Sequence, residues 1–86
     1  LSPPQYRLLA LLDEKIDQIV SRDEIALAVW PDDAAEGITE QAIDALIRRL
    51  REHLRKLAPD RTYLETVRGH GFRLLRFPLP RDGGVL

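Results

Sequence analysis

Apolar residues recur at intervals of three and four in three stretches of the chain, a spacing that predicts three amphipathic helices. The first helix is expected to begin after Ser2, because a hydroxyl followed by Pro3 and then by Gln5 forms a capping box with proline at the first helical position. This helix should run to about Lys15. Its buried stripe is expected to comprise Tyr6, Leu8, Leu9, Leu12 and Ile16.

A second capping box, from Ser21 to Glu24, predicts a short helix that Pro31 ends soon after Trp30. The link between the first two helices, residues 15–20, is too short for another helix and is expected to be a tight turn or a short extended segment. The apolar positions of the second helix are Ile25, Ala28 and Val29.

Residues 31–38 are acidic and have no periodicity, so they are predicted to form a surface loop. Thr39 is then expected to cap a long third helix that ends near Ala58, just ahead of Pro59. Its core-facing positions are Ile43, Leu46, Ile47, Leu50, Leu54 and Leu57.

The pattern after Pro59 changes to that of extended chain. The β-branched and aromatic residues of 62–67, a turn with two glycines over 68–71 and the alternation of 72–74 predict a β-hairpin. Leu64 and Val67 are three residues apart, so a bulge or an early turn is expected near Thr66. We therefore expect one mainly α-helical domain with a small hairpin over residues 1–77, followed by an extended or disordered tail over residues 78–86.

Composition restricts the class of protein further. A chain of 86 residues is long enough for one small domain. Because it has no cysteine, neither a disulfide nor a cysteine-ligated metal can stabilise that domain. Its longest apolar run, residues 8–12, is far too short to span a membrane, which favours a cytoplasmic protein without a membrane partner. A chain that opens at Leu1 rather than at methionine is expected to be a fragment of something longer.

Charge is unevenly distributed although the chain as a whole carries a net charge of -1. Residues 1–46 carry three basic and ten acidic side chains, whereas residues 47–76 carry nine basic and three acidic ones. Such asymmetry is typical of a domain with one anion-binding half, although it also fits a helix with a solvated basic face. The third helix carries much of this charge on the face opposite its apolar stripe, with Gln41, Asp44, Ala45, Arg48, Glu52 and Arg55 on that face and Arg49, Arg51 and Lys56 beside it.

Three helices followed by a glycine-tipped hairpin follow the element order of a winged helix-turn-helix. The segments LSPPQYRLLALL, VSRDEIALAVW, ITEQAIDALIRRLREHL and YLETVRGHGFRLL resemble, in order and spacing, the DNA-binding domain of OmpR/PhoB-type response regulators of two-component systems. The resemblance implies a transcription regulator whose third helix lies in the DNA major groove and whose wing enters the minor groove. It also implies that the loop 31–38 can touch RNA polymerase. The family's N-terminal sheet is expected to be absent from this fragment.

Side chains near the start of a groove-bound helix meet base edges, so the expected base contacts are Gln41, Asp44, Ala45 and Arg48. Arg48 is the strongest candidate because an arginine fork binds guanine bidentately. Asp44 either accepts from a cytosine amino group or orients Arg48, and orientation is favoured. The expected phosphate contacts are Arg49, Arg51, Arg55 and Arg73, although Arg73 equally fits a pair with an acidic neighbour.

On the wing, Thr66 and Arg68 match the family positions that approach the minor groove, where a guanidinium senses groove width. The two glycines, Gly69 and Gly71, match the family's turn glycines and are expected to let the hairpin tip approach the DNA backbone.

The sequence offers no support for catalysis. His53 and His70 have no carboxylate or thiol at ligand or triad spacing, so neither an enzyme nor a metal or cofactor site is expected. The leading hypothesis is sequence-specific binding of double-stranded DNA, with pairs of domains on repeated half-sites. The alternative is a winged helix that docks an acidic protein partner through its basic face.

Overall fold

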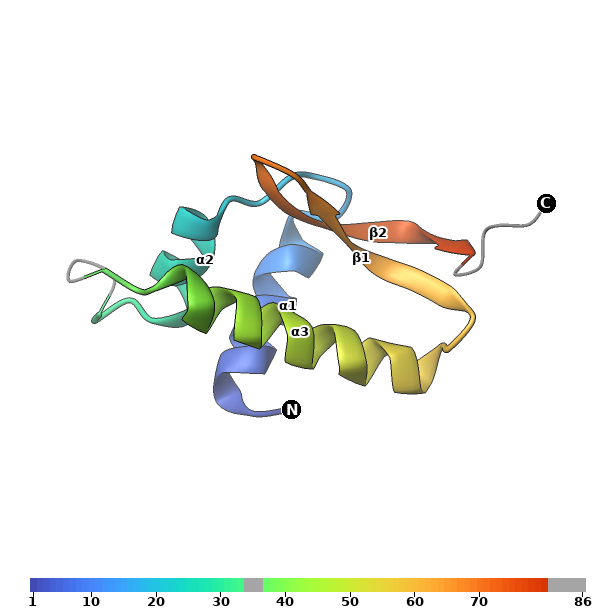
Figure 1. The fold of residues 1–86 in the computed structure, drawn as a ribbon, viewed down its shortest axis with the longest axis horizontal. Coiled ribbons are helices and arrows are strands. Elements are labelled where there is room, and N and C mark those ends of the chain that lie inside the picture. Colours follow the sequence, from blue (N-terminus) through green and yellow to red (C-terminus); the bar gives the residue numbers. More distant parts are fainter. Residues whose placement is uncertain (34–36, 81–86) are drawn as a thin grey trace.

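The computed structural model describes residues 1–33 and 37–80. Three helices, α1 (Pro3–Glu14), α2 (Arg22–Val29) and α3 (Glu40–Leu57), are followed by the strands β1 (Arg61–Val67) and β2 (Gly71–Pro80). The strands form a two-stranded antiparallel hairpin. In Figure 1, α3 runs below the hairpin along its length, α1 crosses α3, and α2 lies to the left of the hairpin. The predicted architecture, three helices and a wing, is confirmed.

Local capping signals determine where all three helices begin. Ser2 and Gln5 form a reciprocal capping box at α1, and Ser21 and Glu24 form one at α2. At α3 the Thr39 hydroxyl accepts a hydrogen bond of 3.1 Å from the backbone N–H of Ala42. These pairs satisfy backbone N–H groups that have no partner within the helix.

The capping carboxylate of α2 also forms an ion pair with Lys15, the C-cap residue of α1. Glu24 accepts from the backbone N–H of Ser21 at 3.2 Å, and its other oxygen lies 3.1 Å from the ammonium of Lys15. The backbone hydrogen bond first and the lysine second hold the pKa of the Glu24 carboxyl below its usual value. The start of α2 is thus joined to the end of α1.

The core lies between the helices and the inner face of the hairpin. Its fully or nearly fully buried residues come from the three helices, from residue 20 and from both strands: Leu8, Leu12, Val20, Ile25, Ala26, Val29, Ile43, Leu46, Ile47, Leu50, Leu64, Phe72 and Leu74. Leu9, Ile16, Trp30 and Leu54 pack against this core and are partly buried.

Three expected core positions differ in the structure. Tyr6 is 65% exposed, because helical geometry places it about 160° around α1 from the buried Leu8. Leu57 is 72% exposed, because it is the last residue of α3 and lies past the part of the helix that the core covers. In α2 the buried alanine is Ala26, whereas Ala28 is only half-buried.

The hairpin is regular near its tip and irregular near its base. Thr66 pairs with Phe72 in register, so the bulge or early turn expected near Thr66 is wrong. The register shifts between Thr62, which pairs with Leu79, and Leu64, which pairs with Leu74, and the extra residues lie on β2. They include Pro78, which has no N–H to donate to a ladder.

The link between α1 and α2, expected to be a tight turn or a short extended segment, contains both: a turn over residues 15–17 and an extended end that pairs with β2 at Val20. Val20 and Phe72 exchange two backbone hydrogen bonds of 2.7 and 2.9 Å, and the Asp17 N–H donates to the Leu74 carbonyl at 2.8 Å. Asp17 adopts a left-handed conformation, and its carboxylate accepts from the Arg76 N–H at 3.0 Å. The link therefore satisfies β2 groups on the edge that β1 leaves open.

The second strand is longer than the sequence indicates. Residues 78–80, expected at the start of the tail, belong to β2, and the remaining tail residues 81–86 lie outside the described part of the chain. Within the described residues, no helix is both long and apolar enough to cross a bilayer.

The bridge between the link and β2 leads to a prediction about two glycines. Gly71 has a φ of +145°, and a Cβ added there would overlap the carbonyl oxygen of Val20. Gly69 has a φ of +80° and open space around the same position. Gly71→Ala should therefore lower the free energy of unfolding by about 3 kcal/mol and Gly69→Ala by about 1 kcal/mol, measured by urea denaturation.

The Gly69→Ala variant serves as the control, because it introduces the same methyl group at a left-handed position without a neighbour. Equal losses for the two variants would contradict a close approach of the hairpin to Val20.

Candidate nucleic-acid interface

The face of α3 that points away from the core carries the predicted base-reading residues. Gln41, Asp44 and Arg48 are exposed, and Ala45, which lies between them on the helix, is half-buried. Arg49 and Arg55 are also exposed. This face therefore combines exposed hydrogen-bonding groups near the start of α3 with guanidinium groups along its length.

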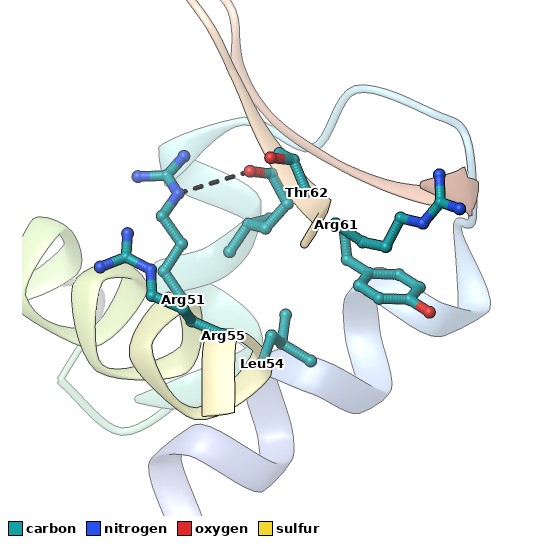
Figure 2. Close-up of a pocket in the computed structure, with 7 residues that line it drawn as sticks. Arg51, Leu54, Arg55, Arg61 and Thr62 are labelled. Carbon is teal, nitrogen blue, oxygen red and sulfur yellow. Dashed lines mark hydrogen bonds between the residues drawn. The ribbon is translucent and has the colours of Figure 1, made fainter. Parts of the chain in front are cut away.

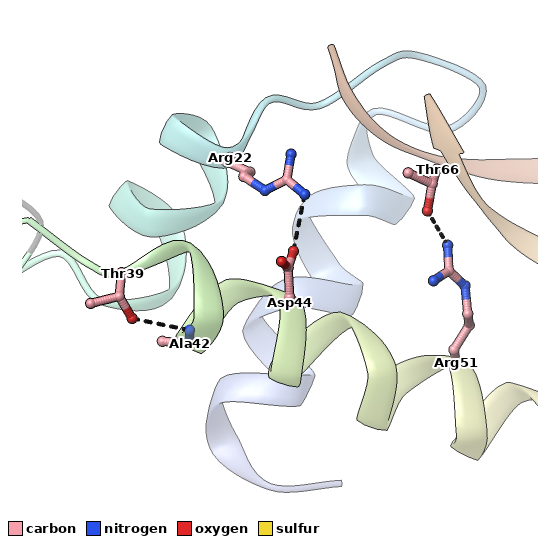
Figure 3. A network of polar contacts seen from close by, with 6 residues as sticks. All are labelled: Arg22, Thr39, Ala42, Asp44, Arg51 and Thr66. Atoms are coloured by element: carbon pink, nitrogen blue, oxygen red, sulfur yellow. Dashed lines mark hydrogen bonds and ion pairs between the residues drawn. The ribbon is translucent and has the colours of Figure 1, made fainter. Parts of the chain in front are cut away.

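Asp44 is paired with a residue that the sequence analysis did not assign to the site. Its Oδ1 accepts a hydrogen bond of 3.0 Å from Nη2 of Arg22, the first residue of α2 (Figure 3). The favoured interpretation, that Asp44 orients Arg48 one turn further on, is therefore wrong for this structure. No signal in the sequence marks the pair, because Arg22 lies in the acidic half and 22 positions before Asp44.

The side chain of Arg22 extends from α2 to contact both α3 and the wing. Its guanidinium carbon is 4.9 Å from the centre of the Phe72 ring on β2, a distance typical of a cation–π contact. Its Nε is buried and has no hydrogen-bond partner among the described residues. The side chain is 35% exposed, so the rest of the guanidinium still reaches the surface.

Arg51, expected on a phosphate, joins α3 to β1. Its Nη2 donates to the Thr66 hydroxyl at 2.5 Å (Figure 3), and its Nε donates to the Leu64 carbonyl at 3.4 Å. Burial of the guanidinium, and secondarily the charge of Arg55, lower the pKa of Arg51. Thr66, expected at the minor groove, is thus the acceptor that holds this arginine.

A hollow of about 220 Å³ lies beside this contact, between the end of α3 and the base of β1 (Figure 2). In Figure 2, Arg51 and Arg55 extend to one side of the strand and Arg61 to the other. The hollow is lined by Arg51, Leu54, Arg55, Arg61, Thr62, Tyr63 and Leu64.

Arg73 pairs with an acidic neighbour, which is the second of the two interpretations that the sequence left open. Its Nη2 and Nε both donate to Glu65 Oε1, at 2.6 and 2.9 Å, across the hairpin. Both side chains are about one-third exposed, at 34% and 32%. The pair neutralises part of the charge that the sequence assigned to phosphate binding.

The wing tip presents exposed cationic and aromatic groups. Arg68 and His70 are both exposed on the turn between β1 and β2. Gly69 supplies the positive φ of that turn, but Gly71 is buried against Val20 rather than free to approach DNA. The expectation that both glycines serve DNA approach is therefore wrong for Gly71.

The remaining candidates from the sequence are His53, which is of a metal-ligating residue type, and the loop before α3. His53 is exposed on α3, and the described residues contain no cluster of three or more His, Cys, Asp or Glu side chains able to hold a metal ion. The loop predicted over 31–38 falls between α2 and α3, with Asp32 and Asp33 exposed, and its residues 34–36 lie outside the described part of the chain.

Comparison with known proteins places these features in a family. The family model described as "Transcriptional regulatory protein, C terminal" matches residues 1–74. The chain is 38% identical over 74 residues to the alkaline phosphatase synthesis transcriptional regulatory protein SphR of Synechococcus elongatus, covering 86% of the chain and 28% of that protein. It is 39% identical over 70 residues to the heme response regulator HssR of Staphylococcus aureus, covering 81% of the chain and 30% of that protein. The chain thus spans less than a third of the length of these relatives.

Solved structures agree with the sequence comparison. The DNA-binding domain of E. coli CadC matches with a TM-score of 0.79 and 26% identity, covering 93% of this chain and 73% of that one. The Klebsiella pneumoniae RstA DNA-binding domain, solved in complex with the RstA box, matches with a TM-score of 0.65 and 25% identity, covering 87% and 72%.

The contact between Arg51 and Thr66 leads to a stability prediction. Thr66→Val keeps the shape and β-branching of the side chain but removes the hydroxyl acceptor, which leaves a partly buried guanidinium donor without its partner. The free energy of unfolding should fall by about 1 kcal/mol in urea denaturation.

Thr62→Val is the matched control on the same strand, because the Thr62 side chain has no hydrogen bond to any described residue. A loss for Thr62→Val as large as that for Thr66→Val would show that the hydroxyl of Thr66 does not hold the wing to α3.

Proposed function

This chain belongs to the family of C-terminal domains of transcriptional regulatory proteins, and from that premise we propose that it reads double-stranded DNA with α3 in the major groove and the hairpin in the adjacent minor groove. The family and the fold are those of DNA-binding domains of transcription regulators, which are not enzymes. The observation that carries the proposal is that the outward face of α3 and the wing tip, two adjacent elements, both present exposed arginines.

The first turns of α3 read bases. Gln41, Ala45 and Arg48 follow one another on the face turned away from the core, and Asp44 lies beside them. Arg48 binds the O6 and N7 of guanine, which contributes about 1–3 kcal/mol of discrimination. Ala45 allows a close approach and can contact a thymine methyl group.

Phosphates are neutralised mainly by the exposed arginines Arg49 and Arg55. Arg51 uses its Nε and one Nη2 donor within the domain and reaches a phosphate with its remaining donors. Arg73 contributes less, because Glu65 balances its charge. These contacts supply affinity without base preference.

We also propose contacts beyond DNA, on the basis of family membership. The exposed acidic loop that contains Asp32 and Asp33 contacts RNA polymerase, and two copies of the domain bind repeated half-sites. The double variant Asp32→Asn, Asp33→Asn should reduce transcription from a target promoter but leave DNA affinity unchanged. The number of domains bound to duplexes with one or two half-sites, measured by titration, tests binding in pairs. Docking of an acidic protein partner on the basic face is not favoured by the family.

The salt dependence and base preference of binding test the groove assignment together. If about four phosphates are neutralised, log affinity should fall against log salt with a slope of about -4. Arg55→Ala should reduce the slope by about one and weaken all duplexes alike, because Arg55 lies two turns beyond Arg48 where the helix leaves the groove. Arg48→Ala should instead flatten the preference at one or two base pairs.

The two variants are controls for each other, since each removes one exposed arginine from α3. An affinity that does not depend on salt would refute binding through phosphates. Equal base preferences for the wild type and Arg48→Ala would refute this orientation of α3.

The wing reads groove shape through Arg68, and Thr66 approaches the same groove from β1. Narrow A·T-rich minor grooves have an enhanced negative potential that attracts an inserted arginine. Arg68→Ala should therefore reduce discrimination between A·T-rich and G·C-rich flanks of one core site, and Arg68→Lys should restore it poorly because lysine lacks the planar guanidinium. Affinities for one core site in both flanking contexts measure this, and an unchanged flank preference would remove the wing arginine from the interface.

A further inference from the structure

Arg22 contacts more of the protein than a solvated surface arginine does. It is the first residue of α2, it donates to Asp44 on α3 at 3.0 Å, and its guanidinium lies 4.9 Å from the ring centre of Phe72 on β2. Three elements therefore meet at one side chain. Figure 3 shows the guanidinium extended from α2 toward the Asp44 carboxylate.

This position is unfavourable in one respect, because the buried Nε has no hydrogen-bond partner among the described residues. An unsatisfied buried donor raises the free energy of the folded state. The side chain is nevertheless held there by the charge of Asp44 and by the face of the Phe72 ring. A feature that costs stability and fixes one carboxylate on the outward face of α3 suggests a role in recognition.

We propose that Arg22 is a positioning residue for base reading, which acts by holding one oxygen of Asp44 so that the other accepts a hydrogen bond from a cytosine amino group in the major groove. The proposal rests on the proposed function, since it requires α3 to lie in that groove. Asp44 is about half exposed, and only its Oδ1 is engaged by Arg22. A carboxylate held in this way keeps its second oxygen available as an acceptor for cytosine N4.

The charge of Arg22 is as important as its geometry. A lone carboxylate close to DNA would be repelled by the phosphates, and the ion pair with Arg22 offsets that repulsion. The backbone hydrogen bonds between Val20 and Phe72 hold the Phe72 ring against the Arg22 guanidinium. The same hydrogen bonds therefore help to place both the wing and the arginine that holds Asp44. Lysine could keep the charge but not the planar fork and the stacking.

Affinities of the 86-residue chain for duplexes that differ by single base pairs from a selected site test this role. Asp44→Ala should reduce the preference at one C·G pair by roughly ten-fold. Arg22→Met, which keeps the aliphatic stem, should reduce the preference at that same pair and at no other. The double variant should show no further loss at that pair, because both substitutions remove one interaction.

Lys15→Met is the matched control: it removes one positive charge from another exposed ion pair of the same half, and it should leave every base preference unchanged. If Arg22→Met fails to fold by circular dichroism, Arg22→Lys replaces it and should lose part of the preference at the same pair. An intact preference in a folded Arg22 variant overturns the proposal.

Two further outcomes separate this proposal from the function on which it rests. Uniform weakening of all duplexes by Arg22→Met, with no selective loss at one pair, would assign Arg22 to a phosphate and overturn the positioning role. A wild-type chain without any base preference would instead refute the proposed function itself.

Discussion

The pair of backbone hydrogen bonds between Val20 and Phe72 is the contact on which the placement of the wing depends. A two-stranded hairpin alone is only marginally stable in water, so β1 and β2 need further support. The link between α1 and α2 supplies this support by forming backbone hydrogen bonds with the open edge of β2. Gly71 permits the close approach of this edge to Val20 because it has no side chain. Phe72 then lies in the core with its ring under Arg22.

Ion pairs and hydrogen bonds decide which arginines of this domain are engaged within the protein and which stay exposed. Arg22 is tied to Asp44, Arg73 to Glu65 and Arg51 to Thr66, whereas Arg48, Arg49, Arg55 and Arg68 are exposed. The two ion pairs, Arg22–Asp44 and Arg73–Glu65, are partly exposed and contribute little to stability. Their larger effect is on geometry, because each tied arginine fixes a partner on α3 or on the wing. A chain with a net charge of -1 can therefore still carry exposed arginines together on α3 and on the wing tip.

Much of the fold and of the candidate interface could be predicted from the sequence because its signals are local. Capping boxes act over three residues, helical periodicity over three or four, and the glycine-containing turn over four, so the three helices, their starts and the hairpin follow from neighbours along the chain. The exposed face of α3 with Arg48 follows from the same periodicity, and the quoted segments sufficed to identify the family.

Tertiary structure alone decided which polar groups pair and where the strands lose register. The partner of Asp44 lies 22 positions away and that of Arg51 lies 15 positions away, and no local pattern encodes such distances. The register shift depends on the extra residues that β2 accommodates between Leu74 and Leu79, and the exposure of Tyr6 depends on which side of α1 the other elements cover. The sequence thus determined the elements and their charged faces, whereas packing determined the positions of the side chains, because only the assembled core brings distant residues within hydrogen-bonding distance.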